Sequence, residues 1–215
     1  MPMVLWHWAN LLAIGFLALS GFYIHYPIIP GLMGLARGTH FFWMFVLLIA
    51  LVCRLIFLFT VKDANMPDTR EVAPDYKNWL PQAANRHQMW PWVKYYLFLK
   101  KEHPISAKYG VLQKIAYWVV PFLILAAAYT GFCLWGPTMN LPFFRQGTIW
   151  VASLFNIGGG GDPMAMRIVH YWIMWIFLIF TAAHVYLANI YNFAPSKMIF
   201  AWKETVHSSE RVYED

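Results

Sequence analysis

Two histidines late in the chain, His170 and His184, are 14 residues apart. Each residue of an α-helix turns the chain by about 100°, so both imidazoles face nearly the same direction and lie about 21 Å apart along the axis. No charged residue lies between Arg167 and Lys197, so the segment that carries both histidines is apolar enough to cross a membrane. One imidazole is then expected near each membrane surface, where an ionisable side chain indicates a functional site.

The composition agrees with a membrane protein. Of the 215 residues, 60% are hydrophobic and only 12% are charged, against about 25% in an average soluble domain. A soluble fold of this length needs more polar groups to cover its surface. The composition therefore excludes an ordinary soluble enzyme, a disordered chain and a nucleic-acid-binding module. The net charge of +6 indicates no nucleic-acid partner, because the basic residues follow the membrane pattern described below.

Four segments are long and apolar enough to span a bilayer, which takes about 20 mainly apolar residues. They are residues 4–25, 40–61, 114–135 and 168–191. We predict an all-α integral membrane protein, a four-helix transmembrane bundle in a single domain over residues 1–215. Residues 62–113 form a loop on one side of the membrane, and residues 136–167 form a loop on the other. Outside the spans, residues 88–99 and 146–157 are predicted to lie at the membrane surface as short helices.

The basic residues predict the orientation. Nine Lys or Arg lie in residues 62–114 and three more follow residue 196, whereas the opposite side has only Arg37, Arg145 and Arg167. Because cytoplasmic loops carry the excess of Lys and Arg, the long loop and both termini are predicted to be cytoplasmic.

This orientation pairs four histidines by depth. His7 begins the first span on the inner side, and the last span ends on that side near His184. His40 begins the second span on the outer side, where the last span starts near His170. The sequence therefore predicts an inner pair, His7 with His184, and an outer pair, His40 with His170.

Two imidazoles at each level suit a bis-histidine haem, because six-coordinate haem iron takes one axial ligand on each face of the porphyrin. Zinc fits less well, since it needs three or four ligands around one point. A proton relay usually recruits Asp or Glu, and the spans contain neither. No Cys-x-x-Cys-His motif occurs, so the haems are predicted to be held without thioether links. The remaining histidines are predicted to be polar surface residues: His25, His87, His103 and His207.

Three arginines are candidates for contacts with the cofactors. Arg54 lies in the inner half of the second span and needs a partner, which a haem propionate or a quinone carbonyl would provide. Arg37 and Arg167 flank the outer histidines and are placed to meet propionates there, although ordinary solvated arginines fit equally well. Small residues near the ligands, Gly15, Gly21 and Gly131, would let a porphyrin or another helix approach closely.

Three stretches resemble a known family over nearly the whole chain. Trp6-His7-Trp8, Thr130-Gly131-Phe132 and the segment from His170 to His184-Val185-Tyr186 are similar to the di-haem cytochrome b subunits of respiratory nickel–iron hydrogenases and formate dehydrogenases. The resemblance implies two haem b groups, with metal ligands His7 and His184 at the inner iron and His40 and His170 at the outer iron. It also implies a multi-pass protein of the bacterial cytoplasmic (inner) membrane.

The resemblance further implies electron transfer from a periplasmic iron–sulfur subunit, through the outer and then the inner haem, to menaquinone or ubiquinone. In this family a Lys-Tyr-Asn-x-x-Gln stretch contributes to the quinone site. The matching residues here begin with Lys108 and end with Gln113, but Gly110 replaces the Asn and removes a hydrogen-bond donor. The predicted quinone contacts are therefore Lys108, Gln113 and the inner ligand His184.

The leading hypothesis is the membrane anchor and electron-transfer subunit of a hydrogenase-type complex, with the catalytic centre for the primary substrate on partner chains. The equivalent subunit of a formate dehydrogenase or thiosulfate reductase is the first alternative, since the sequence does not name the electron donor. A stand-alone transmembrane reductase resembling eukaryotic-type cytochrome b561 is the second, but that family has six spans. A structural anchor or channel would leave the four depth-matched histidines unexplained.

Overall fold

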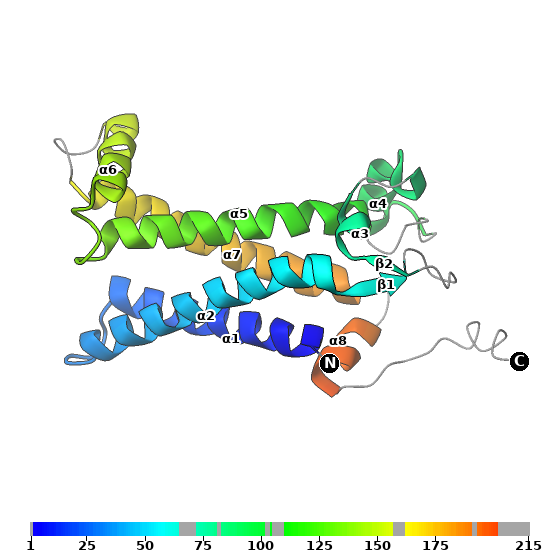
Figure 1. Ribbon diagram of the computed structural model, residues 1–215, viewed down its shortest axis with the longest axis horizontal. Coiled ribbons are helices and arrows are strands. Elements are labelled where there is room, and N and C mark those ends of the chain that lie inside the picture. The colour runs from blue at the N-terminus through cyan, green and yellow to red at the C-terminus, as the bar shows by residue number, and fades with distance from the viewer. Residues whose placement is uncertain are drawn as a thin grey trace, which may run out of the picture.

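Four long helices lie side by side along the longest axis of the molecule in the computed structural model (Figure 1). They are α1 (Pro2–His25), α2 (Met33–Thr60), α5 (Val111–Leu134) and α7 (Met164–Asn189). The structure describes residues 2–64, 72–80, 83–101, 104, 110–156, 162–190 and 193–201. The prediction of an all-α membrane bundle is confirmed. The short strands β1 (Lys62–Ala64) and β2 (Val72–Pro74) are the sole exception in the described residues, and they pair antiparallel with Lys62 opposite Pro74.

All four helices have the length and hydropathy of membrane spans, with mean hydropathy between 1.4 and 2.7. Only 11% to 28% of each span is buried inside the protein. Large apolar side chains such as Leu19, Phe122 and Ile179 therefore point outward, each about two-thirds or more exposed. This surface suits contact with lipid tails, because its side chains are apolar and the helix backbone satisfies its own hydrogen bonds.

The helices begin earlier than the hydrophobic runs predict. Helix α2 begins at Met33 rather than near residue 40, and α7 begins at Met164 rather than near residue 168. His40 and His170 therefore lie about two turns inside their helices and not at the first residue. The helical backbone continues beyond the apolar run because arginines and glycines at a membrane surface are hydrated there and do not interrupt the hydrogen bonds of the helix.

The bundle consists of two antiparallel hairpins. Helix α1 packs along α2, and α5 packs along α7, while α2 and α5 have a lighter contact between the hairpins. Buried side chains from all four helices meet in the middle of the bundle, in a cluster of Ala13, Leu47, Leu51, Ile124, Ile173 and Phe177. This cluster is here called the apolar layer. In α7, the helix that carries two of the paired histidines, its residues Ile173 and Phe177 lie between His170 and His184.

Short helices cover both ends of the bundle (Figure 1). At one end lies α6 (Pro142–Phe155), which begins with proline in its first turn and ends at Asn156 in a left-handed conformation. At the other end lie α3 (Tyr76–Trp79), η1 (Ala83–Asn85), α4 (Met89–Tyr96) and α8 (Ala194–Ala201). The predicted surface helices at 88–99 and 146–157 correspond to α4 and α6. The indole of Trp8 donates to the carbonyl of Ile199 at 3.0 Å and joins α8 to α1.

Candidate functional site

The structure brings the four histidines together in the pairs that their depth predicts. His40 of α2 and His170 of α7 face each other with ring centroids 6.2 Å apart. His7 of α1 and His184 of α7 do the same at the other end, with centroids 6.4 Å apart. Helix α7 supplies one imidazole to each level, and the second imidazole comes from a different helix of the other hairpin.

A cavity of about 660 Å³ opens at the outer pair and extends along the bundle axis between the hairpins. Its volume lies within the range of small-molecule and cofactor sites, about 300–1,000 Å³. Both outer imidazoles, Gly21, Gly131 and apolar side chains of all four long helices line the cavity. Arg37 and Arg167 border it as well, so both arginines lie where a carboxylate of a bound molecule would need a positive partner.

Each outer imidazole contacts a hydroxyl of the neighbouring helix. The Ser20 hydroxyl lies 2.9 Å from Nδ1 of His40, and the Thr130 hydroxyl lies 2.8 Å from Nδ1 of His170. All four side chains are at least half-buried, and the two hydroxyl residues are only 6% exposed. Ser20 and Thr130 were not among the predicted site residues. The sequence pattern that could have indicated them is a hydroxyl residue directly before a glycine, which occurs at the same depth in α1 and in α5.

Two of the predicted small residues lie beside the outer imidazoles. A Cβ atom at Gly21 would lie 3.5 Å from Cε1 of His40, and one at Gly131 would lie 3.5 Å from Cε1 of His170, which is ordinary van der Waals contact. The close approach of a porphyrin at these glycines stays a prediction. Gly15 has no neighbour within 4 Å of such a Cβ atom among the described residues.

The inner pair is supported by aromatic rings. Phe180 stacks on His184 one helical turn away, with ring centroids 6.1 Å apart. Nδ1 of His7 is buried and has no hydrogen-bond partner within the part of the chain that the structure describes. The hydroxyl of Tyr186 donates to the carbonyl of Tyr96, which joins α7 to α4 beside the inner level. Burial and the neighbouring Tyr95 raise the pKa of Tyr96, so its phenol stays protonated at neutral pH.

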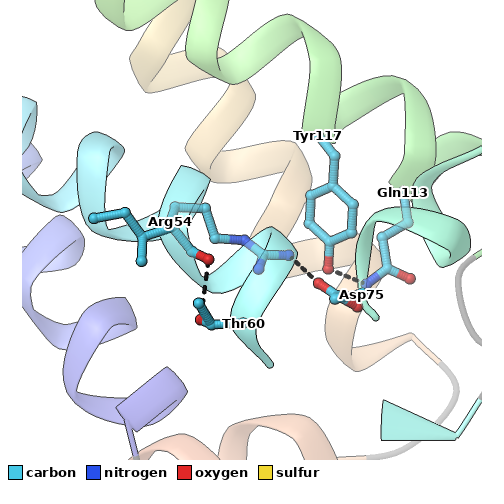
Figure 2. Close-up of polar contacts among 6 residues, drawn as sticks. Arg54, Thr60, Asp75, Gln113 and Tyr117 are labelled. Carbon is cyan, nitrogen blue, oxygen red and sulfur yellow. Dashed lines mark hydrogen bonds and ion pairs between the residues drawn. The ribbon is translucent and has the colours of Figure 1, made fainter. Parts of the chain in front are cut away.

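Arg54 has a different partner from the predicted ones. Its guanidinium forms a salt bridge with Asp75 at 2.8 Å, and both side chains are about 95% buried (Figure 2). Asp75 therefore takes the place that was predicted for a propionate or a quinone carbonyl, and Nη1 of Arg54 is buried without a hydrogen-bond partner among the described residues. The guanidinium also lies over the rings of Trp79 and Tyr117, at 5.0 and 5.6 Å from their centroids. This ion pair attaches α3 to the inner end of α2.

The predicted quinone residues are only partly described. Gln113 is exposed at the start of α5, and its amide donates to the hydroxyl of Tyr117 at 2.9 Å (Figure 2). Lys108 lies outside the described residues. The neighbouring Lys114 is buried and donates to the carbonyl of Leu80 at 2.7 Å, so it holds the inner loop against α5.

The other histidines differ from the paired four. His25 is exposed, as predicted for a surface residue, but it also borders the outer cavity and stacks on Tyr171 with centroids 4.4 Å apart. His87 is exposed in a turn with a φ of 60°. His103 and His207 lie outside the described residues.

A family model described as prokaryotic cytochrome b561 matches residues 1–201. The chain belongs to the prokaryotic cytochrome b561 family. The match covers all four long helices, both histidine pairs and α8. The cofactor of a b-type cytochrome is haem b, which agrees with the absence of a thioether attachment motif from the sequence.

Named relatives of this cytochrome extend over most of the chain. A protein of Azotobacter vinelandii named probable Ni/Fe-hydrogenase B-type cytochrome subunit is 29% identical over 199 residues, which cover 87% of this chain and 77% of the relative. A Rhizobium leguminosarum bv. viciae protein of the same name is 25% identical and covers 100% of this chain and 87% of the relative. The Escherichia coli K12 probable Ni/Fe-hydrogenase 1 B-type cytochrome subunit is 25% identical, with 87% and 79% covered.

The geometry of both histidine pairs fits haem iron. A metal–imidazole nitrogen bond is about 2.0–2.1 Å long and a ring centre lies about 1.1 Å behind its nitrogen, so two imidazoles on opposite sides of one metal have centroids about 6.3 Å apart. The observed separations of 6.2 and 6.4 Å agree with this value. No group of three or more His, Cys, Asp or Glu is arranged to hold a metal ion in the described residues, which argues against a zinc site.

Proposed function

We propose that this cytochrome holds two bis-histidine haems, one at each level, and carries electrons across the membrane between a partner enzyme and quinone. The observation that supports the proposal most is the separation of the rings, because the centroids of both pairs lie 6.2–6.4 Å apart. One helix, α7, connects the levels with a rise of about 21 Å. Haem supplies one-electron chemistry when it is bound, and the protein supplies its position.

The side chains of the bundle act as ligands, supports and insulation. His40 and His170 would hold the outer haem iron, and His7 and His184 would hold the inner one. Arg37 and Arg167 border the outer cavity and are proposed to meet its propionates. The apolar layer lies between the levels, so electrons would cross a region of low dielectric that contains no charged side chain of the layer.

The partner is proposed from the relatives. The names of the related proteins assign them to Ni/Fe-hydrogenases. We infer that this chain anchors an iron–sulfur subunit and a catalytic subunit of such a complex on the outer side of the bacterial inner membrane. The charge pattern supports this orientation, with both termini and residues 62–113 in the cytoplasm. The second candidate is the equivalent subunit of a formate dehydrogenase or thiosulfate reductase, because the same four-helix bundle with two histidine pairs would serve there.

Purification of the chain from its own membranes tests the partner. The tagged protein is expected to co-purify with a hydrogenase, and hydrogen gas is expected to reduce its haems without an added mediator. Reduction of the haems by formate, or oxidation of the reduced haems by thiosulfate, without reduction by hydrogen would favour the second candidate. A stand-alone reductase would purify alone and would accept electrons from a small donor, which would contradict the proposed partner.

The quinone site is proposed at the inner end, near Lys108, Gln113 and His184. The exposed amide of Gln113, which already bonds to Tyr117, is placed to donate to a carbonyl of menaquinone or ubiquinone. Quinone reduction at this level would take its protons from the cytoplasm. If oxidation occurs outside, each transferred charge then contributes about 2.3 kcal/mol per 100 mV of membrane potential.

Gln113→Ala is expected to slow quinone reduction by about twofold to tenfold, because one hydrogen bond contributes about 0.5–1.5 kcal/mol. The haem content should remain unchanged, since the side chain is exposed and does not contact a histidine in the structure. The measurement is the rate of quinone reduction together with the haem absorbance of the same sample. Gln88→Ala, a change of a second glutamine at the same end of the bundle, serves as the control. Equal rates in Gln113→Ala and the unchanged protein would remove Gln113 from the site.

A further inference from the structure

We propose that Ser20 and Thr130 are positioning residues that hold the outer imidazoles in the tautomer that binds iron and lower the midpoint potential of the outer haem below that of the inner haem. This inference rests on the proposed function, because it needs one haem at each level. It adds a direction: an electron that arrives on the outer side moves downhill to the inner side.

Each hydroxyl donates its single proton to a carbonyl of its own helix. The Ser20 hydroxyl donates to the carbonyl of Phe16 at 2.6 Å, one helical turn earlier. The Thr130 hydroxyl donates to the carbonyl of Ala126 at 2.8 Å in the same way. A hydroxyl has one proton and two acceptor positions, so each oxygen can only accept from the nearby imidazole.

The imidazoles are therefore protonated at Nδ1. Protonation at Nδ1 leaves the lone pair of Nε2 free for the iron. The hydroxyl contacts fix both the tautomer and the rotation of each ring, as second partners of metal-binding histidines commonly do.

The two hairpins of the bundle repeat this arrangement. In the first hairpin, Ser20-Gly21 of α1 meets His40 of α2, and in the second, Thr130-Gly131 of α5 meets a histidine of α7. In both, the hydroxyl lies within 3 Å of Nδ1 and the glycine lies beside Cε1 of the same ring. The same local packing in two hairpins that share no chain segment indicates that the hydroxyl contact belongs to the site and is not incidental.

At the inner level, at least one of the two imidazoles lacks such a hydrogen bond at Nδ1. Nδ1 of His7 is buried without a hydrogen-bond partner among the residues that the structure describes. A hydrogen bond from Nδ1 makes an imidazole a stronger electron donor to the metal and stabilises the oxidised iron. The outer haem is thus expected to have the lower potential. Transfer between the levels would remove one electron from the outer haem and add one to the inner haem, with no bond made or broken.

Ser20→Ala and Thr130→Val remove the hydroxyls and leave all four paired histidines in place, so both haems should remain bound. At a fixed ambient potential, each variant is expected to raise the ratio of reduced to oxidised outer haem about threefold, and the double variant about tenfold. A tenfold change corresponds to about 59 mV for a one-electron couple. The midpoint potentials are measured by optical redox titration, and the His7→Ala background isolates the outer haem.

Matched variants separate this effect from a general loosening of the bundle. Thr130→Ser keeps the hydroxyl and should keep the potential. Thr181→Val removes a hydroxyl that bonds to the carbonyl of Phe177 on its own helix, and it should shift neither haem. Unchanged outer potentials in Ser20→Ala and Thr130→Val, or an equal shift in Thr181→Val, would overturn the inference. A protein without two haems would instead contradict the proposed function, so the two failures are distinguishable.

Discussion

His40→Ala and His170→Ala are each expected to abolish the same haem and to lower the haem content from two per chain to one. The centroids of the two rings lie 6.2 Å apart and the rings come from different hairpins, so in the proposed arrangement both would hold the same iron. His7→Ala and His184→Ala are expected to abolish the other haem for the same reason. The measurement is the haem-to-protein ratio and the reduced-minus-oxidised spectrum of each purified variant.

His25→Ala is the matched control for this series. His25 borders the same outer cavity and stacks on Tyr171, but it is exposed and does not face another histidine. Its substitution should leave both haems in place. The pairing is refuted if His40→Ala and His170→Ala remove spectrally different haems, because a shared iron cannot lose one ligand without affecting the other.

Asp75→Ala is expected to destabilise the protein by about 3–5 kcal/mol, since it leaves the guanidinium of Arg54 buried without its charge partner. The ion pair is 2.8 Å long and almost fully buried, so water does not replace the lost carboxylate. Its loss should also release α3 from the inner end of the bundle. Chemical unfolding in detergent, followed by tryptophan fluorescence, measures the change, because Trp79 is buried beside this pair.

The double variant Arg54→Met with Asp75→Leu isolates the unpaired charge as the cause. With both charges replaced by apolar groups of similar size, the loss of stability should be much smaller than in Asp75→Ala alone. Lys77→Ala, which removes an exposed charge from the same short helix, should change the stability by no more than about 0.5 kcal/mol. Equal stability of Asp75→Ala and the unchanged protein would show that the ion pair does not secure the inner loop.

The sequence predicts the histidine pairs because helical geometry and membrane depth together determine where the rings lie. His170 and His184 share one helix and one face, so their separation needs no tertiary information. The other two rings are placed by the direction in which each span crosses the membrane, and the charges in the loops determine that direction. The boundaries of the helices were less predictable, because α2 and α7 continue past the ends of their apolar runs.

The supporting contacts depend on tertiary structure and could not be predicted in the same way. Residues 62–113 contain five acidic residues, and nothing in their spacing shows that Asp75 is the one that reaches Arg54. Ser20 and Thr130 lie 20 and 40 residues from the histidines that they contact. A hydroxyl in a membrane helix commonly bonds to its own helix, so its second contact with a ring appears only when two helices are packed together.

The central claim is that two haems lie one above the other, each between two histidines of this chain. The most direct measurement is the haem content of the purified protein by the pyridine haemochrome assay, combined with a redox titration of the same sample. Two haem b per chain, which titrate as two one-electron transitions and keep low-spin six-coordinate spectra, are the expected result. One haem per chain, or a high-spin spectrum that indicates a missing axial ligand, would contradict the account.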